Sequence, residues 1–475
     1  MEKTQVNEIN FFTTYRCNSR CKNCLIWKGH LLPPSRKKKM DEKDLKRLFS
    51  DPLFVNCSDI GLAGGEPTIS PFFWKLMDFL PDNKHVTITT NALSSERLLD
   101  FLCRSGDKAR YMVQLSLDGI GDINDRIRGV RGAYQKTLDL LKELETIGIG
   151  RLISFTINRL NYYQLKDCYG LARDHGAEFS ARMAYAGGAY SNRENREVFR
   201  FDRDELDRLS QDLNDIVARE IRRPSHSPSK IVFLNKITDH YRGIQEDIPC
   251  LALESGMVID LYGNIFPNCP AMMTPIGNLH EACLEEIWAS EKARKIRDRI
   301  KKLKCGGCWN DCQVITNIEF DREFLDNEYS RLKIAYLEGK PVPYLIDFNQ
   351  GEFSLLLSGW YDIEGDSDFK FRWTEQEFSI LLPGGTTSLE MFAMSPPDSK
   401  PDSPYTMDVV MGQEKMGTIV FTGSDWKKHS VRLLGQTNGL TPCKFRLNSY
   451  YCPKEAGKSE DTRKLGLAIH GISFA

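Results

Sequence analysis

Hydrophobic and polar positions repeat in a regular way over residues 8–183. Six short runs rich in β-branched and other apolar residues alternate with segments in which apolar residues recur at helical spacing. The strand candidates are 8–14, 58–63, 85–90, 111–117, 152–157 and 178–183. The helix candidates are 40–50, capped by Asp41, then 72–80, a segment capped by Ser94 or Ser95, 133–147 and 163–175. Such repeated units predict a parallel sheet with crossover helices, in which ligands bind at the carboxyl ends of the strands.

The pattern changes beyond this region. Residues 202–222 carry charges of both signs at helical spacing, which is typical of a solvated helix, and 319–340 is a further helix candidate. Over 351–475, short alternating apolar and polar runs are separated by Gly, Pro, Asp and Ser, which predicts an antiparallel β-sandwich. We therefore expect four parts, covering residues 1–230, 231–318, 319–350 and 351–475.

Composition narrows the class of protein. The chain has 475 residues, a formal net charge of −1, 41% hydrophobic and 27% charged residues, as expected for a globular protein of two or three domains. A net charge near zero argues against a chain that mainly binds nucleic acid or an anionic membrane. The sequence shows neither an apolar run that could span a membrane nor a secretory signal, so we expect a cytoplasmic location.

The chain has 14 cysteines, and eight of them fall in two groups. Without an export signal, clustered thiols indicate metal or redox chemistry rather than a disulfide framework. The groups comprise Cys17, Cys21 and Cys24, and then Cys250, Cys269, Cys305, Cys308 and Cys312. The others are interpreted as buried apolar residues, and they are Cys57, Cys103, Cys168, Cys283, Cys443 and Cys452.

The first group favours an iron–sulfur cluster over zinc, although thiolates are soft ligands that suit both. A structural zinc site needs four ligands, whereas this group has three cysteines with only His30 nearby. A four-iron cubane held by three thiolates would leave one iron open to an exogenous ligand. A zinc site or an accidental grouping of cysteines is the alternative.

Polar residues follow three of the predicted strands at one edge of the sheet. Residues 64–67 (Gly-Gly-Glu-Pro) come after the second strand, where glycines let a ligand approach the backbone and the carboxylate could receive an ammonium group. Asn91 follows the third strand. Ser116 and Asp118 share one face at the end of the fourth, which suits a pair of ribose hydroxyls. Taken singly, each of these features is also explained by a tight turn or a cap.

Together, these motifs resemble those of the radical S-adenosylmethionine (SAM) enzymes. The resemblance rests on the Cys-x3-Cys-x2-Cys loop after the first strand, the Gly-Gly-Glu-Pro segment, Ser116-x-Asp118 and the run at 126–134, and it covers residues 8–312. It implies a partial (β/α)6 barrel that holds a [4Fe–4S] cluster. It also implies that the amino and carboxylate groups of SAM bind the open iron.

The resemblance also implies roles for individual residues. Cys17, Cys21 and Cys24 would ligate iron. The contacts with SAM would come from Gly64, Gly65, Glu66 and Pro67 at the amino group, Asn91 in the pocket, Ser116 and Asp118 at the ribose, and Arg128 at the carboxylate. The chain departs from the family at one position. An aromatic residue often precedes the third cysteine and packs near the adenine, but here the residue is Asn23, which leaves Trp27 as a candidate for that contact.

The second cysteine group resembles the SPASM or twitch extension of the same superfamily. The spacing Cys250-x12-Gly-x5-Cys269, followed by Cys305-x2-Cys308-x3-Cys312, is close to that pattern, although the full extension carries more cysteines than the five found here. The resemblance implies one auxiliary [4Fe–4S] cluster. Cys250, Cys269, Cys308 and Cys312 are the favoured ligands and Cys305 is a fifth candidate. Four thiolates also satisfy zinc, so a zinc-stabilised mini-domain is the alternative.

The C-terminal segment shows a weaker resemblance, to a β-sandwich module of some bacterial glycosyltransferase-like and surface-polysaccharide proteins. It rests on residues 359–364, 372–373 and 461–466. It implies a domain that holds a carbohydrate, a carrier or a protein partner. A generic sandwich with packing aromatics is the alternative.

The leading functional hypothesis is a radical SAM enzyme that forms a 5′-deoxyadenosyl radical and abstracts hydrogen from a peptide or protein side chain. SPASM-bearing relatives usually modify peptides, and an electron donor would be a further partner. The C-terminal module suggests an alternative, the modification of a sugar or carrier-linked glycan. A non-enzymatic zinc scaffold is a third hypothesis. The sequence identifies no catalytic acid, base or hydrogen donor, and no particular substrate.

Overall fold

The structure is a computed structural model in which the chain forms two compact units. The described residues are 6–29, 38–184, 190, 192, 196–241, 248–269, 274–302, 309–337, 345–348, 355–365, 369–382, 386–398, 403–433 and 441–474. One unit comprises Met1–Thr238 with Asp247–Asp326, and the other comprises Asp239–Glu246 with Asn327–Ala475. The division into four parts made from the sequence stays a prediction.

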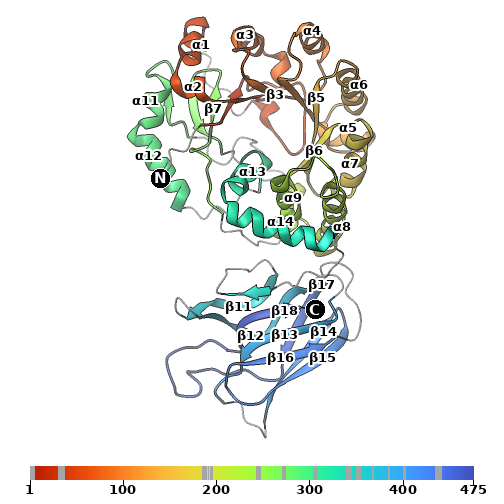
Figure 1. Cartoon of the computed structure of the whole chain (residues 1–475), viewed down its shortest axis with the longest axis vertical. Coiled ribbons are helices and arrows are strands. Elements are labelled where there is room, and N and C mark those ends of the chain that lie inside the picture. Colours follow the sequence, from red (N-terminus) through yellow and green to blue (C-terminus); the bar gives the residue numbers. More distant parts are fainter. Residues whose placement is uncertain are drawn as a thin grey trace. The chain divides into compact units, whose positions relative to one another are not determined.

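The first unit is built on a nine-stranded sheet in the order β6-β5-β4-β3-β2-β1-β7-β8-β9 (Figure 1). Its strands are β1 (Glu8–Phe12), β2 (Asp59–Ala63), β3 (His85–Thr90), β4 (Tyr111–Ser116), β5 (Gly150–Ile157), β6 (Glu178–Met183), β7 (Gly256–Asp260), β8 (Asn264–Pro267) and β9 (Gly277–Asn278). Strands β1 to β6 are parallel and paired in sequence order, which confirms the predicted parallel sheet. The sequence did not predict that β7 pairs with the free edge of β1, so that the second cysteine region extends the same sheet.

Helices cover one face of this parallel sheet (Figure 1). The helices of the chain are α1 (Glu42–Phe49), α2 (Pro52–Asn56), α3 (Pro71–Phe79), α4 (Glu96–Arg104), α5 (Asp122–Arg128), α6 (Ala133–Thr146), α7 (Leu165–Asp174), α8 (Arg203–Glu220), α9 (Pro228–Asn235), α10 (Ile237–Tyr241), α11 (Leu284–Ala289), α12 (Glu291–Lys302), α13 (Asp311–Phe320) and α14 (Arg322–Leu337). Alternate strand residues such as Ile88, Val113 and Phe155 are fully buried beneath them. No helix in the described part of the chain has both the length and the apolar character that crossing a membrane requires.

The predicted helix caps differ in their outcome. Asp41 caps α1 by accepting backbone hydrogen bonds from the first turn, as predicted. Ser95 precedes α4, but its side chain makes no capping hydrogen bond. The backbone of Ser95 is already near-helical, with φ −105° and ψ −12°, whereas a capping side chain normally belongs to an extended residue.

Four of the six scattered cysteines are buried as predicted, namely Cys57, Cys168, Cys443 and Cys452. The prediction was wrong for Cys103, which is exposed, and Cys283 is only half-buried. Cys103 follows the buried Leu102 on α4, and neighbouring positions of a helix point about 100° apart. Cys283 is the residue before α11, where a helix end meets solvent.

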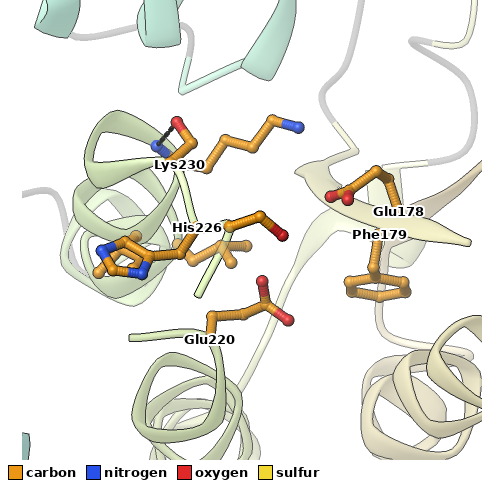
Figure 2. A pocket seen from close by; sticks show the side chains of 9 residues that line it. Glu178, Phe179, Glu220, His226 and Lys230 are labelled. Atoms are coloured by element: carbon orange, nitrogen blue, oxygen red, sulfur yellow. Dashed lines mark hydrogen bonds between the residues drawn. The ribbon is translucent and has the colours of Figure 1, made fainter. Parts of the chain in front are cut away.

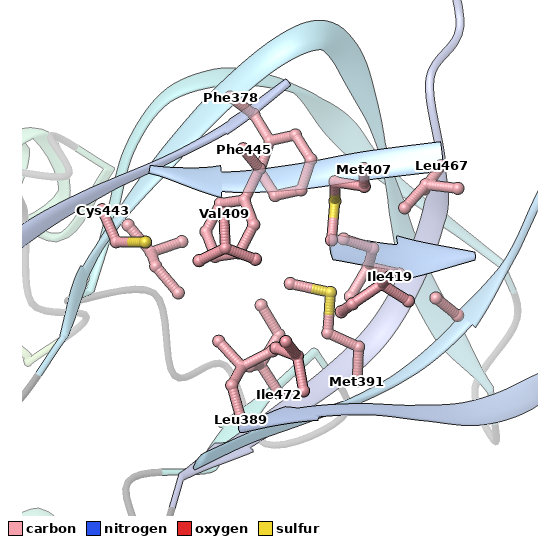
Figure 3. Close-up of a cluster of buried hydrophobic side chains, with 14 of the residues drawn as sticks. Phe378, Leu389, Met391, Met407, Val409, Ile419, Cys443, Phe445, Leu467 and Ile472 are labelled. Carbon is pink, nitrogen blue, oxygen red and sulfur yellow. The ribbon is translucent and has the colours of Figure 1, made fainter. Parts of the chain in front are cut away.

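The second unit is an antiparallel sheet that encloses its own core. Its strands are β10 (Leu345–Asp347), β11 (Leu356–Gly365), β12 (Lys370–Leu382), β13 (Ser388–Met394), β14 (Tyr405–Met411), β15 (Glu414–Phe421), β16 (Lys427–Arg432), β17 (Thr441–Leu447) and β18 (Ala468–Phe474). The main order is β15-β14-β17-β12-β18-β13-β16, and the two end strands lie against each other, so the sheet is nearly closed. Figure 3 shows the enclosed side chains, among which the rings of Phe378 and Phe445 stack with their centroids 4.8 Å apart. The predicted antiparallel β domain is therefore confirmed.

Lys84 provides a test of how the first unit is held together. Its side chain is 3% exposed, and Nζ donates to the backbone carbonyls of Phe54 (3.0 Å), Val55 (2.8 Å) and Cys57 (2.6 Å) at the end of α2. We expect Lys84→Met to lower the free energy of unfolding by about 2–3 kcal/mol in a urea titration, because charged hydrogen bonds to buried carbonyls are lost. The control, Lys142→Met on the exposed face of α6, should change it by less than about 0.5 kcal/mol.

Candidate functional site

The predicted cluster loop follows β1 at the carboxyl edge of the parallel strands. Within it, Cys21 is buried, whereas Cys17 and Cys24 are half-buried. One side of the loop is attached to the end of α5, since the backbone N–H of Arg20 donates to the carbonyl of Arg128 at 2.9 Å. Contacts with the surrounding protein therefore help to set the path of this loop.

Three glycines let neighbouring segments approach the cluster loop closely. A Cβ atom at Gly64, whose φ is +134°, would lie 2.6 Å from the carbonyl oxygen of Thr14. At Gly65 it would lie 2.0 Å from the carbonyl oxygen of Arg16. At Gly129, with φ +69°, it would lie 2.3 Å from another backbone oxygen of the loop. No side chain fits at such distances, so these glycines are needed for the packing of the loop itself.

Glu66 joins two loops through a buried carboxylate that is 1% exposed. Its Oε1 atom accepts from the hydroxyls of Thr68 and Thr90, both at 2.8 Å, and Oε2 accepts from the backbone N–H of Asn91 at 2.8 Å. Burial raises the pKa of Glu66, although the hydrogen bonds from Asn91 and Thr90 act in the opposite direction. The carboxylate is thus engaged by the protein. Pro67 is buried at the start of a short helix, so the contact predicted for this segment would involve its backbone.

Asn91 links the end of β3 to the cluster loop. Its Nδ2 atom donates to Oδ1 of Asn18 at 2.8 Å and lies 3.7 Å from Sγ of Cys17. An amide N–H close to a ligand sulfur is the kind of contact that orients metal ligands and adjusts the potential of an iron–sulfur cluster. The structure therefore places Asn91 beside a predicted ligand.

Asp118 and Arg128 form a buried ion pair next to the same loop. Nη1 of Arg128 lies 3.1 Å from Oδ2 of Asp118, and the two side chains are 13% and 1% exposed. The other carboxylate oxygen accepts from the backbone N–H of Thr156 at 2.9 Å. Burial acts to lower the pKa of Arg128, but the neighbouring Asp118 carboxylate raises it overall, so the guanidinium stays charged. Both oxygens of Asp118 are engaged, which supports a role in orienting Arg128, while the ribose contact stays a prediction.

The cysteines of the loop have the environment of buried metal ligands. Burial raises the pKa of Cys17 to about 11 and that of Cys24 to about 12, so the free thiols are protonated at neutral pH. Bound iron stabilises thiolates and would reverse this preference. Among the described residues, no three His, Cys, Asp or Glu side chains converge at metal-binding distance. Ligation by Cys17, Cys21 and Cys24 therefore stays a prediction.

The second cysteine group is described only in part. Cys250 and Cys269 are half-buried. Cys305 and Cys308 lie outside the described residues, and so does the side chain of Cys312, whose backbone lies in the first turn of α13. The choice of four ligands among these five cysteines stays a prediction.

Helix α13 connects the second cysteine region to the parallel strands. The backbone N–H of Leu251, next to Cys250, donates to Oδ1 of Asn317 on α13 at 3.0 Å. At the start of the helix, Asp311 pairs with Arg182 of β6, with 3.1 Å between Oδ2 and Nη2. The segments that carry the first and last cysteines of the group are thus brought to the same part of the unit.

Comparisons with known families account for both cysteine regions. Residues 11–167 match the model of the radical SAM superfamily, and residues 250–313 match that of SPASM, an iron–sulfur cluster-binding domain. The chain carries a radical SAM domain followed by a SPASM domain. The resemblance inferred from the motifs is thereby confirmed.

Curated relatives match the chain over part of their length. Mycofactocin maturase MftC of Mycobacterium tuberculosis is 31% identical over 166 residues, which are 34% of this chain and 41% of the relative. Pre-heme d1 synthase of Dinoroseobacter shibae is 26% identical over 326 residues, 62% of this chain and 77% of the relative. The sporulation killing factor maturation protein SkfB of Bacillus subtilis is 22% identical over 296 residues, which are 62% of this chain and 67% of the relative. The chain thus spans well under half the length of the maturase MftC. A radical SAM domain and relatives named as maturases and synthases indicate an enzyme.

The radical SAM and SPASM domains share a buried hydrogen bond that sequence reasoning missed. The hydroxyl of Tyr15, in the cluster loop, donates to Oδ2 of Asp260 at the end of β7, at 2.9 Å. Asp260 also accepts from the backbone N–H groups of Tyr262 and Asn264, which closes the β7–β8 turn. The only sequence signal was the turn-forming Asp-x-x-Gly at 260–263, and it did not identify Tyr15 as a partner.

A separate cavity of about 330 Å³ lies at the amino end of β6, at the edge opposite to the cluster loop of the radical SAM domain. Figure 2 shows Glu178, Glu220, His226 and Lys230 in its lining. Arg223 already pairs with Glu220 (2.8 Å) and Glu178 (3.6 Å). These ion pairs account for the two carboxylates of the cavity, which is not part of the predicted site.

Proposed function

We propose that the chain is a radical SAM enzyme in which Cys17, Cys21 and Cys24 hold a [4Fe–4S] cluster whose fourth iron binds SAM. When bound, the cluster and SAM supply a 5′-deoxyadenosyl radical that takes a hydrogen atom from the substrate. The observation that carries this proposal is the close packing of the cysteine loop against glycine backbones on both sides, at 64–65 and at Gly129.

The other predicted site residues would bind and orient SAM. Arg128 presents a charged guanidinium that suits the carboxylate of SAM, and Asp118 holds this guanidinium in place. The backbone of residues 64–67 would meet the amino group. Asn91 would support the cluster side of the pocket, and Ser116, at the carboxyl end of β4, would reach the ribose.

We propose a peptide or protein side chain as the substrate. MftC and SkfB, which are named as maturation proteins, support this choice. The sheet face opposite to the helices also suits a polar substrate. Thr89 pairs in register with Gln114, and Ser116 and Ser154 lie side by side on β4 and β5 on that face. Hydroxyl and amide groups arranged in this way can form hydrogen bonds with a peptide backbone.

We further propose one auxiliary [4Fe–4S] cluster in the SPASM domain, held by four of Cys250, Cys269, Cys305, Cys308 and Cys312. The match to the SPASM model spans all five cysteines, which supports this assignment. The proposed chemistry also needs an electron from outside the chain. We therefore propose an electron donor, either a protein or a small molecule, as a further partner besides SAM and the substrate.

The test is the iron and sulfide content of protein purified without oxygen, before and after Cys17, Cys21 and Cys24 are together replaced by Ala. We expect about eight irons per chain to fall to about four, because each cluster is a four-iron cubane. Formation of 5′-deoxyadenosine from SAM should disappear at the same time. Cys103→Ala is the control, since Cys103 is exposed and belongs to neither group. Zinc in place of iron would contradict the proposal and favour the scaffold hypothesis.

A further inference from the structure

Ser19 contacts two of the three predicted iron ligands. It lies between Cys17 and Cys21 in the loop after β1 and is 1% exposed. Its backbone N–H donates to Sγ of Cys17 at 3.4 Å, and its hydroxyl oxygen lies 3.2 Å from Sγ of Cys21. The hydroxyl also donates to the backbone carbonyl of Arg128 at 2.8 Å. The fold therefore holds a buried hydroxyl group directly against a predicted ligand.

The hydroxyl of Ser19 has a single proton for two neighbours. In the iron-free protein, the thiol of Cys21 can donate to Oγ of Ser19 while the hydroxyl donates to Arg128, so both contacts are hydrogen bonds. A cysteine that binds iron releases its thiol proton to solvent and can no longer donate. With iron bound, the contact between Ser19 and Cys21 is a hydrogen bond only if the hydroxyl turns toward the sulfur.

The carbonyl of Arg128 keeps a hydrogen bond when the hydroxyl turns away from it. It also accepts from the backbone N–H of Arg20 at 2.9 Å, so it is not left without a partner. The hydroxyl in turn gains a charged acceptor, and charge-assisted hydrogen bonds are roughly twice as strong as those between neutral groups. With iron bound, the hydrogen bond from Ser19 to Cys21 is therefore favoured over the one to Arg128.

We propose that the hydroxyl of Ser19 donates a hydrogen bond to the iron-bound thiolate of Cys21 and thereby raises the reduction potential of the cluster held by this loop. Reduction adds negative charge, and a hydrogen-bond donor directed at a ligand sulfur stabilises that charge. Ser19 is thus a positioning residue that acts through a ligand. The inference rests on the proposed function and adds to it a residue that controls how readily the cluster accepts an electron.

The test is the reduction potential of this cluster in the full-length, iron-reconstituted protein without SAM. A redox titration followed by electron paramagnetic resonance measures it, and the signal of the cluster is the one missing when Cys17, Cys21 and Cys24 are together replaced by Ala. In Ser19→Ala, the equilibrium constant for one-electron reduction should fall about tenfold, which lowers the potential by about 59 mV. The variant keeps the backbone N–H that donates to Cys17, so the shift reports on the hydroxyl alone.

Ser70→Ala is the matched control. Ser70 is 5% exposed, and its hydroxyl donates to the backbone carbonyl of Thr13 at 2.8 Å, at the start of the same loop. This variant also removes a buried hydroxyl that donates to a carbonyl, but not one that lies beside a cysteine sulfur. It should hold as much iron as the wild type and leave the reduction potential unchanged. The potential of the proposed auxiliary cluster should stay the same in both variants.

Two results would overturn the inference and leave the proposed function standing, because the wild type would still hold its cluster. An unchanged or higher potential in Ser19→Ala, with full iron content, would show that the hydroxyl does not stabilise the reduced cluster. Loss of iron from Ser19→Ala would show that the hydroxyl mainly braces the loop through Arg128. A different result affects both proposals. If replacing the three cysteines removes no signal, this loop holds no cluster, and the proposed function fails together with the inference.

Discussion

Gly65→Ala is expected to prevent the first cysteine group from holding its cluster while the chain still folds. The added methyl carbon would lie 2.0 Å from the carbonyl oxygen of Arg16 and 2.5 Å from its carbonyl carbon. Both are backbone atoms, so the loop itself would have to move. The hydrogen bonds from Gly65 to Thr14 (2.7 Å) and from Glu66 to Arg16 (2.9 Å) would then be lost. Cluster and cofactor sites tolerate only about 0.5 Å of displacement.

The measurement is iron content together with 5′-deoxyadenosine formation. About eight irons per chain should fall to about four. The rate of 5′-deoxyadenosine formation should drop at least about 100-fold, because a displacement of reacting groups by about 1 Å costs about that much. Gly170→Ala is the matched control, because Gly170 lies within α7 and a Cβ there meets nothing within 4 Å. It should keep all of the iron and raise the free energy of unfolding by about 0.5–1 kcal/mol. Equal iron in the two variants would refute the close-packing argument.

Asp118→Ala is expected to cause the largest loss of stability. The change leaves the buried guanidinium of Arg128 without its carboxylate and the backbone N–H of Thr156 without an acceptor. Removing one member of a buried ion pair costs about 3–5 kcal/mol, because the remaining charge stays in a poorly solvated site. We expect a decrease of this size in the free energy of unfolding, measured by urea titration, together with weaker SAM binding.

A comparison of variants separates the two roles considered for Asp118. Asp139→Ala, at an exposed position on α6, should change the free energy of unfolding by less than about 0.5 kcal/mol. If Asp118→Ala loses SAM affinity but keeps wild-type stability, Asp118 contacts the ribose as first predicted and does not mainly orient Arg128. If Asp118→Ala and Arg128→Ala both lose stability, Asp118 acts mainly through its ion pair with Arg128.

Local features of the molecule could be predicted from the sequence. The loop with Cys17, Cys21 and Cys24, the glycines at 64–65 and the polar positions after the strands are all encoded in short stretches of residues. The parallel strands and the C-terminal antiparallel sheet follow from periodicity, because a strand repeats every two residues and a helix every 3.6. These signals depend only on neighbours in the chain, so one sequence was enough to identify the family.

The tertiary structure decided which groups meet. Glu66 and Asp118 each lie at a strand end, as expected. In the folded chain, however, the carboxylate of Glu66 accepts hydrogen bonds from Thr90 and Asn91. The carboxylate of Asp118 accepts hydrogen bonds from Arg128 and Thr156. The pairing of β7 with β1 brings the SPASM region onto the edge of the radical SAM sheet. Hydrogen-bond partners that are distant in the chain leave no periodic trace in it, so these pairs are visible only once the fold has placed them.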